Sequence, residues 1–161
     1  MKRLFLAILF SIAAAWPAAA DEESACHAAS GSYVTGIVLT APQFKGGGKR
    51  KGVELSHTHL SLKADQDGKT YDVAIDNVFA AGYDKARRKV PAPLNTIRKG
   101  DQLGLCGQLY TSGGVGIHWV HTNCGVAPNP NQPDGWVKKL AADGTPSGNF
   151  EGATKYCRLW P

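Results

Sequence analysis

Several sequence signals that would identify an enzyme class or a membrane protein are missing from this chain of 161 residues. It has no Gly-x-Ser-x-Gly nucleophile elbow and no Cys-His signature of a thiol hydrolase. The segment Gly46-Gly47-Gly48-Lys49 lacks the first glycine and the terminal Ser or Thr of a phosphate-binding P-loop. After its first residues, the chain has no apolar run near the length of about 20 residues that crosses a bilayer. A nucleotide-triphosphate enzyme is therefore not expected.

The beginning of the chain has the layout of a cleaved secretory signal. Lys2 and Arg3 precede an apolar run over 4–15, and the small residues Ala18-Ala19-Ala20 are followed at once by acidic residues. The apolar run is too short for a membrane-spanning helix. We expect residues 1–20 to be removed and 21–161 to form one periplasmic or secreted domain with no membrane span. A retained N-terminal anchor is the alternative.

All four cysteines, Cys26, Cys106, Cys124 and Cys157, lie in the part expected to be exported. An even number of cysteines in an exported chain favours disulfides over free thiols. Three pairings are open, and Cys26–Cys106 with Cys124–Cys157 is favoured because it would tie each terminal segment to the middle of the fold. A zinc site is the alternative, although no two cysteines have the close spacing of a metal knuckle.

Positive charge is concentrated in short clusters. The formal net charge of +5 includes Lys2 and Arg3, which would leave with the signal. The first cluster of the remaining chain comprises Lys45, Lys49, Arg50 and Lys51 in a glycine-rich loop. Such a cluster is usually a solvated loop, and it is also the kind of surface that binds phosphates or other anions.

Five segments have the β-branched, aromatic or alternating composition of strands: 33–39, 53–62, 71–75, 103–109 and 115–121. Gly36 predicts a bend in the first, and a change of apolar phase predicts a bulge in the second. Residues 79–89 favour a short helix that Pro91 ends. This order predicts a mainly β fold, a small five-stranded OB-like barrel with a short helix between strands three and four and an extended C-terminal segment.

Four of the five histidines lie in two strand segments: His57 and His59 in one, His118 and His121 in the other. Residues two apart on a strand share a face, so His57 and His59 can act together, whereas His118 and His121 face opposite ways unless the strand breaks. We expect no resident cofactor. A divalent metal is the alternative, and it would need several of these histidines to converge with a carboxylate from Asp72, Asp76 or Asp134. Structural hydrogen bonding is the ordinary role for such residues.

Two functions fit these residues, and a purely structural or inhibitory partner protein is a third possibility. OB-folds bind oligonucleotides and oligosaccharides on the face of strands two and three, so the first possibility is a binding module for an anionic or polymeric ligand. Tyr71, Tyr110 and Trp119 would offer stacking surfaces and the first basic cluster would meet the charges. The second possibility is a histidine- or metal-dependent phosphodiesterase that uses His57, His118 or His121 for proton transfer beside Lys51.

The segment Gly113–His121, with Pro133-Asp134-Gly135-Trp136 after it, resembles a family of short bacterial proteins known as domain of unknown function 3465, whose hallmark is a His-Trp-Thr-His motif. The position of His57, of Asn77 and of the turn Lys99-Gly100-Asp101 is similar to the family pattern. The resemblance implies one site made of His57, Asn77, His118, Trp119 and His121, and it names no reaction. Val120 stands where the family usually has Thr, and Asp76 where it often has His, so a shared site would be altered here. Lys49, Arg50 and Lys51 complete the expected ligand-binding set.

Overall fold

The computed structural model describes residues 17–160. Most of the expected signal over 1–20 lies outside the described residues, and its last residues begin α1 (Pro17–Ala28). In the described range no helix is long and apolar enough to cross a membrane.

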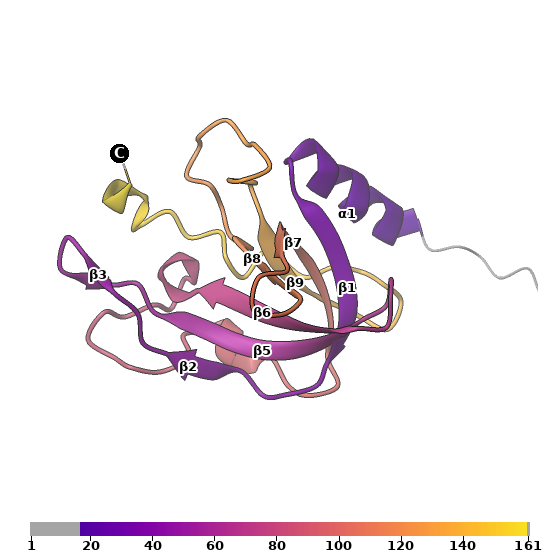
Figure 1. Ribbon diagram of the computed structural model, residues 1–161, viewed down its shortest axis with the longest axis horizontal. Helices are drawn as coiled ribbons and strands as arrows, with labels where there is room; N and C mark the ends of the chain where they lie inside the picture. Colours follow the sequence, from indigo (N-terminus) through magenta and orange to yellow (C-terminus); the bar gives the residue numbers. More distant parts are fainter. Residues whose placement is uncertain (1–16, 161) are drawn as a thin grey trace, which may run out of the picture.

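The fold is a closed five-stranded barrel (Figure 1). Its strands are β1 (Ser32–Val38), β5 (His57–Ala64), β6 (Thr70–Asp76), β7 (Gln102–Tyr110) and β8 (Gly116–His118). They pair in the order β1-β5-β6-β8-β7, and β7 pairs back with β1 to close the barrel. Neighbours are antiparallel except for β6 and β8, which are parallel. The predicted mainly β, OB-like fold is confirmed.

Strand β1 changes partner at Gly36, where the sequence predicts a bend. Gly36 pairs with Ala64 on β5 and with Leu103 on β7. A Cβ at this position would lie 2.2 Å from the carbonyl oxygen of Lys63. Only glycine therefore allows β1 to pass from one partner to the other at this corner of the barrel.

The connection from β1 to β5 carries the first basic cluster. It contains β2 (Gln43–Lys45), which pairs with β5, and a hairpin of β3 (Lys49–Arg50) and β4 (Val53–Glu54). Lys51 and Gly52 have φ values of 47° and 76° at the tip, as a two-residue primed turn requires. The predicted strand over 53–62 is thus divided into β4 and β5, and its change of apolar phase marks a break rather than a bulge.

The connection from β6 to β7 differs from the predicted helix over 79–89. It contains two single-turn 3-10 helices, η1 (Asn77–Phe79) and η2 (Leu94–Thr96), and turns between them. Asp84 accepts a hydrogen bond from the backbone N–H of Ala86 at 3.0 Å, which competes with helical bonding. Gly82 donates to the carbonyl of Ala92 at 2.7 Å and holds the segment back against the proline-rich end of the connection.

Strand five is interrupted. The predicted strand over 115–121 ends at His118, because Trp119 has a φ of 54° and leaves the sheet. The chain rejoins the same edge of β7 as β9 (Trp136–Leu140): His118 pairs with Gln108, and Trp136 pairs with Cys106. We call the intervening segment, 119–135, the excursion.

The two predicted disulfides are confirmed, Cys26–Cys106 and Cys124–Cys157, so these cysteines form no zinc site. The first ties α1 to β7, and the second ties the excursion to the C-terminal tail, which ends in η3 (Cys157–Leu159). The main core fills the barrel. A second, smaller core lies under the tail and is formed by Val53, Val78, Phe79, Tyr83, Tyr156 and Leu159. In Figure 1 the tail and the tip of the β3–β4 hairpin lie on the same side of the barrel.

Candidate functional site

The centre of the candidate site is Asp76, the last residue of β6. Along β6 the side chains of Val73 and Ile75 point into the barrel, so Asp76 points outward. His57 is its direct neighbour on β5, and the Nε2 atom of His57 lies 2.7 Å from Oδ1 of Asp76. From the excursion, Nε2 of His121 lies 3.2 Å from Oδ2 of Asp76. One carboxylate thus joins two histidines from distant parts of the chain.

His121 is placed by acceptors on both sides of its ring. Its Nδ1 lies 2.7 Å from the carbonyl oxygen of Thr122, and its Nε2 faces Asp76. A carbonyl and a carboxylate can only accept hydrogen bonds, so both ring nitrogens of His121 face acceptors. The arrangement therefore holds the buried His121 ring in one orientation directly against Asp76.

The surroundings shift the pKa values of Asp76, His57 and His118 away from their ordinary values. Burial alone would raise the pKa of Asp76, but hydrogen bonds from His121 and His57 outweigh it and hold that pKa well below its ordinary value. The hydrogen bond to Asp76 raises the pKa of His57. Burial lowers the pKa of His118, and the nearby His121 and His57 lower it further. His57 and His118 are therefore shifted in opposite directions.

A second carboxylate, Asp72, lies on the same face of β6 four residues before Asp76 and also contacts a histidine. Oδ1 of Asp72 lies 3.1 Å from Nδ1 of His59, and its Oδ2 accepts a hydrogen bond from the Tyr110 hydroxyl at 2.7 Å. His57 and His59 share the outer face, as predicted, with ring centroids 6.2 Å apart. Tyr110 packs edge-on against His118, which brings the fourth histidine to this face. The outer face of β5, β6 and β8 is thus lined by histidines and carboxylates.

A cavity of about 530 Å³ opens beside Asp76, between the barrel, the excursion and the tail. Four of its eleven lining residues carry aromatic rings. The Phe79 and His121 rings stack with centroids 3.9 Å apart, Trp160 stacks on Phe79 at 5.3 Å, and Trp119 lies against His121 at 4.9 Å. The remaining walls are formed by Thr122, Asn123, Cys124, Val126, Gln132 and Cys157.

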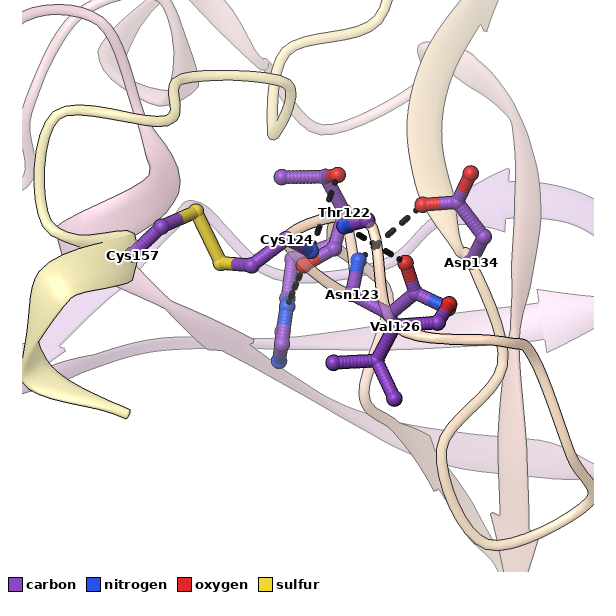
Figure 2. The surroundings of a disulfide bond; sticks show 8 residues. Thr122, Asn123, Cys124, Val126, Asp134 and Cys157 are labelled. Carbon is purple, nitrogen blue, oxygen red and sulfur yellow. Dashed lines mark hydrogen bonds between the residues drawn. A yellow bond between two sulfur atoms is a disulfide. The ribbon is translucent and has the colours of Figure 1, made fainter. Parts of the chain in front are cut away.

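The Cys124–Cys157 disulfide holds the two walls of the cavity together (Figure 2). Around it the excursion is ordered by its own polar groups. Asp134 accepts a hydrogen bond from the Asn123 backbone N–H at 3.0 Å, and the Asn123 side chain donates to the Val126 carbonyl at 2.7 Å. Asp134, one of the carboxylates considered for a metal site, therefore orders the loop.

The basic hairpin adjoins the cavity. The Arg50 guanidinium lies over the Trp160 ring, 5.6 Å from its centroid, and the Lys51 ammonium donates to the Arg158 carbonyl at 3.3 Å. Lys49 is exposed on the same hairpin. Among the salt bridges of residues 17–160, none uses Lys49, Arg50, Lys51 or Arg158. These four cations therefore have no carboxylate partner in the described part of the chain, and Arg50 contacts the cavity wall Trp160.

Other residues of the predicted site lie elsewhere. Asn77 is fully buried, and its amide accepts from the Thr58 hydroxyl at 2.5 Å and donates to Ser56 at 3.0 Å, so it fixes the end of β6 under the site. Tyr71 packs against the barrel core away from the cavity. In the part of the chain that the structure describes, no three His, Cys, Asp or Glu side chains are grouped to hold a metal ion.

Three contributors to this region were not predicted. Phe79 lay in the expected helix, and Trp160 lay in a tail with no strand pattern. Glu151 is fully buried with neither carboxylate oxygen hydrogen-bonded, and burial together with the charge of Asp76 raises its pKa well above the ordinary value. Its place beside Asp76 has no local sequence signal, because it depends on how the tail folds back.

Comparison with protein-family models and with curated proteins finds no match to this chain. The family resemblance of the His-Trp segment therefore stays a prediction, and the functional argument depends on the geometry of the site.

Proposed function

We propose that this protein is an exported binding module for an anionic polymer, which it holds on the basic hairpin and in the adjoining aromatic cavity. The observation that carries the proposal is the position of Arg50 over Trp160, since Trp160 is a wall of the cavity. This contact places a cation without a carboxylate partner beside an aromatic ring. Proteins that bind single-stranded nucleic acid combine positive charge with aromatic rings in this way.

Export is part of the proposal. Two disulfides fit an oxidising compartment such as the periplasm or the outside of the cell. The expected signal over 1–20 would send the chain there. A polymer of that compartment, either nucleic acid or acidic oligosaccharide, is the ligand class that follows.

The electrostatics of the cavity are compatible with an anion. Asp76 is its carboxylate, and both of its oxygens are engaged by histidine nitrogens within the site. Lys49, Arg50, Lys51 and Arg158 then leave the rim positive. If each meets one phosphate of a single strand, the slope of log affinity against log salt is about −3.

The test is a titration of the purified protein with heparin and with a fluorescent oligothymidylate at about 50 and about 200 mM salt. We expect affinity to fall about fiftyfold over this range for a slope near −3. A triple variant, Lys49→Gln, Arg50→Gln and Lys51→Asn, is expected to lose most of the affinity. Asn is chosen at position 51 because it tolerates positive φ. The matched control removes three lysines outside the hairpin, Lys85→Gln, Lys89→Gln and Lys99→Gln. Salt-independent binding, or equal losses in both triple variants, would contradict the proposal.

A second candidate function, histidine-based phosphodiester cleavage, is favoured by one observation. His57 and His118 lie close enough to influence each other and have pKa values shifted in opposite directions, as a general acid and a general base require. In this proposal His118 takes the proton of the attacking hydroxyl and His57 gives one to the leaving oxygen. The test is hydrolysis of RNA with and without divalent metals: His118→Ala should abolish turnover without unfolding the protein. Absence of turnover by the unmodified protein under all these conditions would end this candidate.

A further inference from the structure

The polar groups of the cavity are mostly used within the protein. Both oxygens of Asp76 face histidines, and the Asn123 amide accepts from the Gly125 N–H at 3.2 Å and donates to the Val126 carbonyl. A sugar carries a hydroxyl on nearly every carbon and would need partners that these walls do not have free. The walls suit a flat apolar ring better.

Two polar groups of residues that line the cavity take part in no hydrogen bond among residues 17–160. The indole N–H of Trp119 is buried and has no hydrogen-bond partner. A buried donor without a partner is costly, and a ligand acceptor would satisfy it once the Trp119 ring turns this edge toward the cavity. The Gln132 side chain takes part in none of the hydrogen bonds found among residues 17–160 and is exposed beside the cavity. One fixed donor and one adaptable amide are the kind of groups that read the edge of a base.

The size of the cavity and the charges near it also suit a nucleobase with attached phosphates. At about 530 Å³ it lies within the usual range of about 300–1,000 Å³ for small-molecule sites. Its wall Trp160 carries Arg50 on one side, and Arg50 leads to Lys49 and Lys51 on the hairpin. A ring that enters here would therefore leave its attached phosphates next to the cations.

We propose that the cavity between Trp119 and Trp160 binds one nucleobase of a single-stranded oligonucleotide, whose backbone phosphates lie on the basic hairpin. This inference rests on the proposed function and names its ligand. The hairpin binds the phosphate backbone of any strand. The cavity adds affinity only for a strand that carries bases.

The experiment compares oligothymidylate with an abasic strand of the same length, so that the phosphates are the same and only the bases differ. Fluorescence anisotropy at one salt concentration gives both affinities. We expect the strand with bases to bind about tenfold more tightly, because stacking contributes about that factor or more per base. Both strands should show the same steep salt dependence.

Two variants and one control test whether the preference for the strand with bases arises in the cavity. Trp160→Ala removes one aromatic wall, and Trp119→Phe keeps a ring and removes the free indole N–H; each should bring the two strands to within about twofold of each other while the abasic strand binds as before. Trp136→Phe is the matched control, because its indole N–H is also buried without a partner but lies on β9 outside the cavity. It should leave the preference unchanged.

The outcomes separate this inference from the proposed function. Equal binding of the two strands by the unmodified protein, or binding of heparin alone, would overturn the base pocket and leave the anionic-polymer proposal standing. Binding of a neutral oligosaccharide that Trp160→Ala abolishes would also overturn it. Failure to bind heparin and both strands would overturn the two together.

Discussion

Nε2 of His121, in the excursion, lies 3.2 Å from Oδ2 of Asp76, at the end of β6. This contact closes a link between the interrupted fifth strand and the third strand of the barrel. His57 on β5 binds the other oxygen of the same carboxylate. The excursion, which supplies a wall of the cavity, is therefore joined to the third strand of the barrel through Asp76, and Asp76 is the most informative side chain to change.

Asp76→Asn should destabilise the protein in a particular pH window. The pKa of His57 is raised by Asp76, so the stability it contributes is full below the ordinary histidine value of about 6.5 and is lost as pH rises through its folded pKa. The pKa of Asp76 is lowered, so its contribution is present above about 3.9 and is lost only as pH falls through its folded value. The cost should therefore be largest between about pH 4 and about pH 6.5, at about 1–3 kcal/mol, and should shrink by about pH 9.

Urea unfolding at about pH 5.5 and about pH 9 measures this difference. Asp72→Asn is the matched control, since Asp72 also binds a histidine and has a more exposed side chain, 47% against 25% for Asp76. Its cost should be smaller at both pH values. Equal costs for the two variants would show that Asp76 has no special role in joining the excursion to the barrel.

The titration of the histidines themselves gives an independent check. NMR of the imidazole protons should show His57 titrating above and His118 titrating below the ordinary value of about 6.5. In Asp76→Asn the pKa of His57 should fall, because the hydrogen bond that raises it is weakened while burial remains. His118 should shift down as well, since the charge of Asp76 raises its pKa in the intact protein. An unmoved His57 would contradict the pairing.

The barrel could be predicted from the sequence because its evidence is local. Alternation marks β6, Gly36 marks the corner of β1, and the cysteines suggest their pairing through the need to tie each terminal segment to the middle of the fold. The break at Trp119 could not be predicted, since the alternating pattern runs on through Trp119 itself and a non-glycine residue with positive φ has no composition signal. That break is what turns His121 toward Asp76 instead of the opposite face.

The sequence predicted some residues of the candidate site and missed others. His57, His118 and His121 are brought to one region, and the basic hairpin adjoins it, which the positions of these residues suggested. Trp160 reaches the cavity because the tail folds back over the barrel end, where a disulfide and the second core hold it, and Asn77 proves to be a buried support. The positions of Trp160 and Asn77 depend on contacts between segments far apart in the sequence. Such contacts leave no local pattern of residues from which they could be predicted.

Glu151 should be a source of instability at neutral and higher pH. Its pKa is raised well above the ordinary value, so the folded protein keeps a proton that the unfolded chain releases above about 4.3, and stability falls as pH rises toward the folded pKa. Glu151→Met removes both unpartnered oxygens at similar volume. We expect the free energy of unfolding to increase by about 1–3 kcal/mol at about pH 8 and by less at about pH 4.

Glu151→Gln separates ionisation from polarity, because it keeps an unpartnered polar group that does not titrate. It should remove the same part of the pH dependence while stabilising less than Met. A loss of stability at about pH 8 in both variants would mean that the ionised carboxylate has a favourable partner in solution.

The two disulfides should differ in what their removal does to function. Cys124 and Cys157 are 33 residues apart, which in the chain-entropy model corresponds to about 3–4 kcal/mol, and Cys26 and Cys106 are 80 apart, which corresponds to slightly more. Stability alone would therefore rank Cys26–Cys106 as the more important disulfide. The geometry ranks them the other way for binding, since the Cys124–Cys157 bond joins two walls of the cavity and the Cys26–Cys106 bond fastens α1 to β7 away from it.

Paired Cys→Ser variants test this, with unfolding and oligonucleotide binding measured on the same samples at a temperature where each remains folded. Cys124→Ser with Cys157→Ser should abolish the preference for bases over the abasic strand, because the tail that carries Trp160 is released. Cys26→Ser with Cys106→Ser should leave that preference within about twofold of the intact protein although it costs at least as much stability. If both variants keep the preference, the tail holds its place through the second core alone, and Trp160 needs no covalent tie to form the cavity.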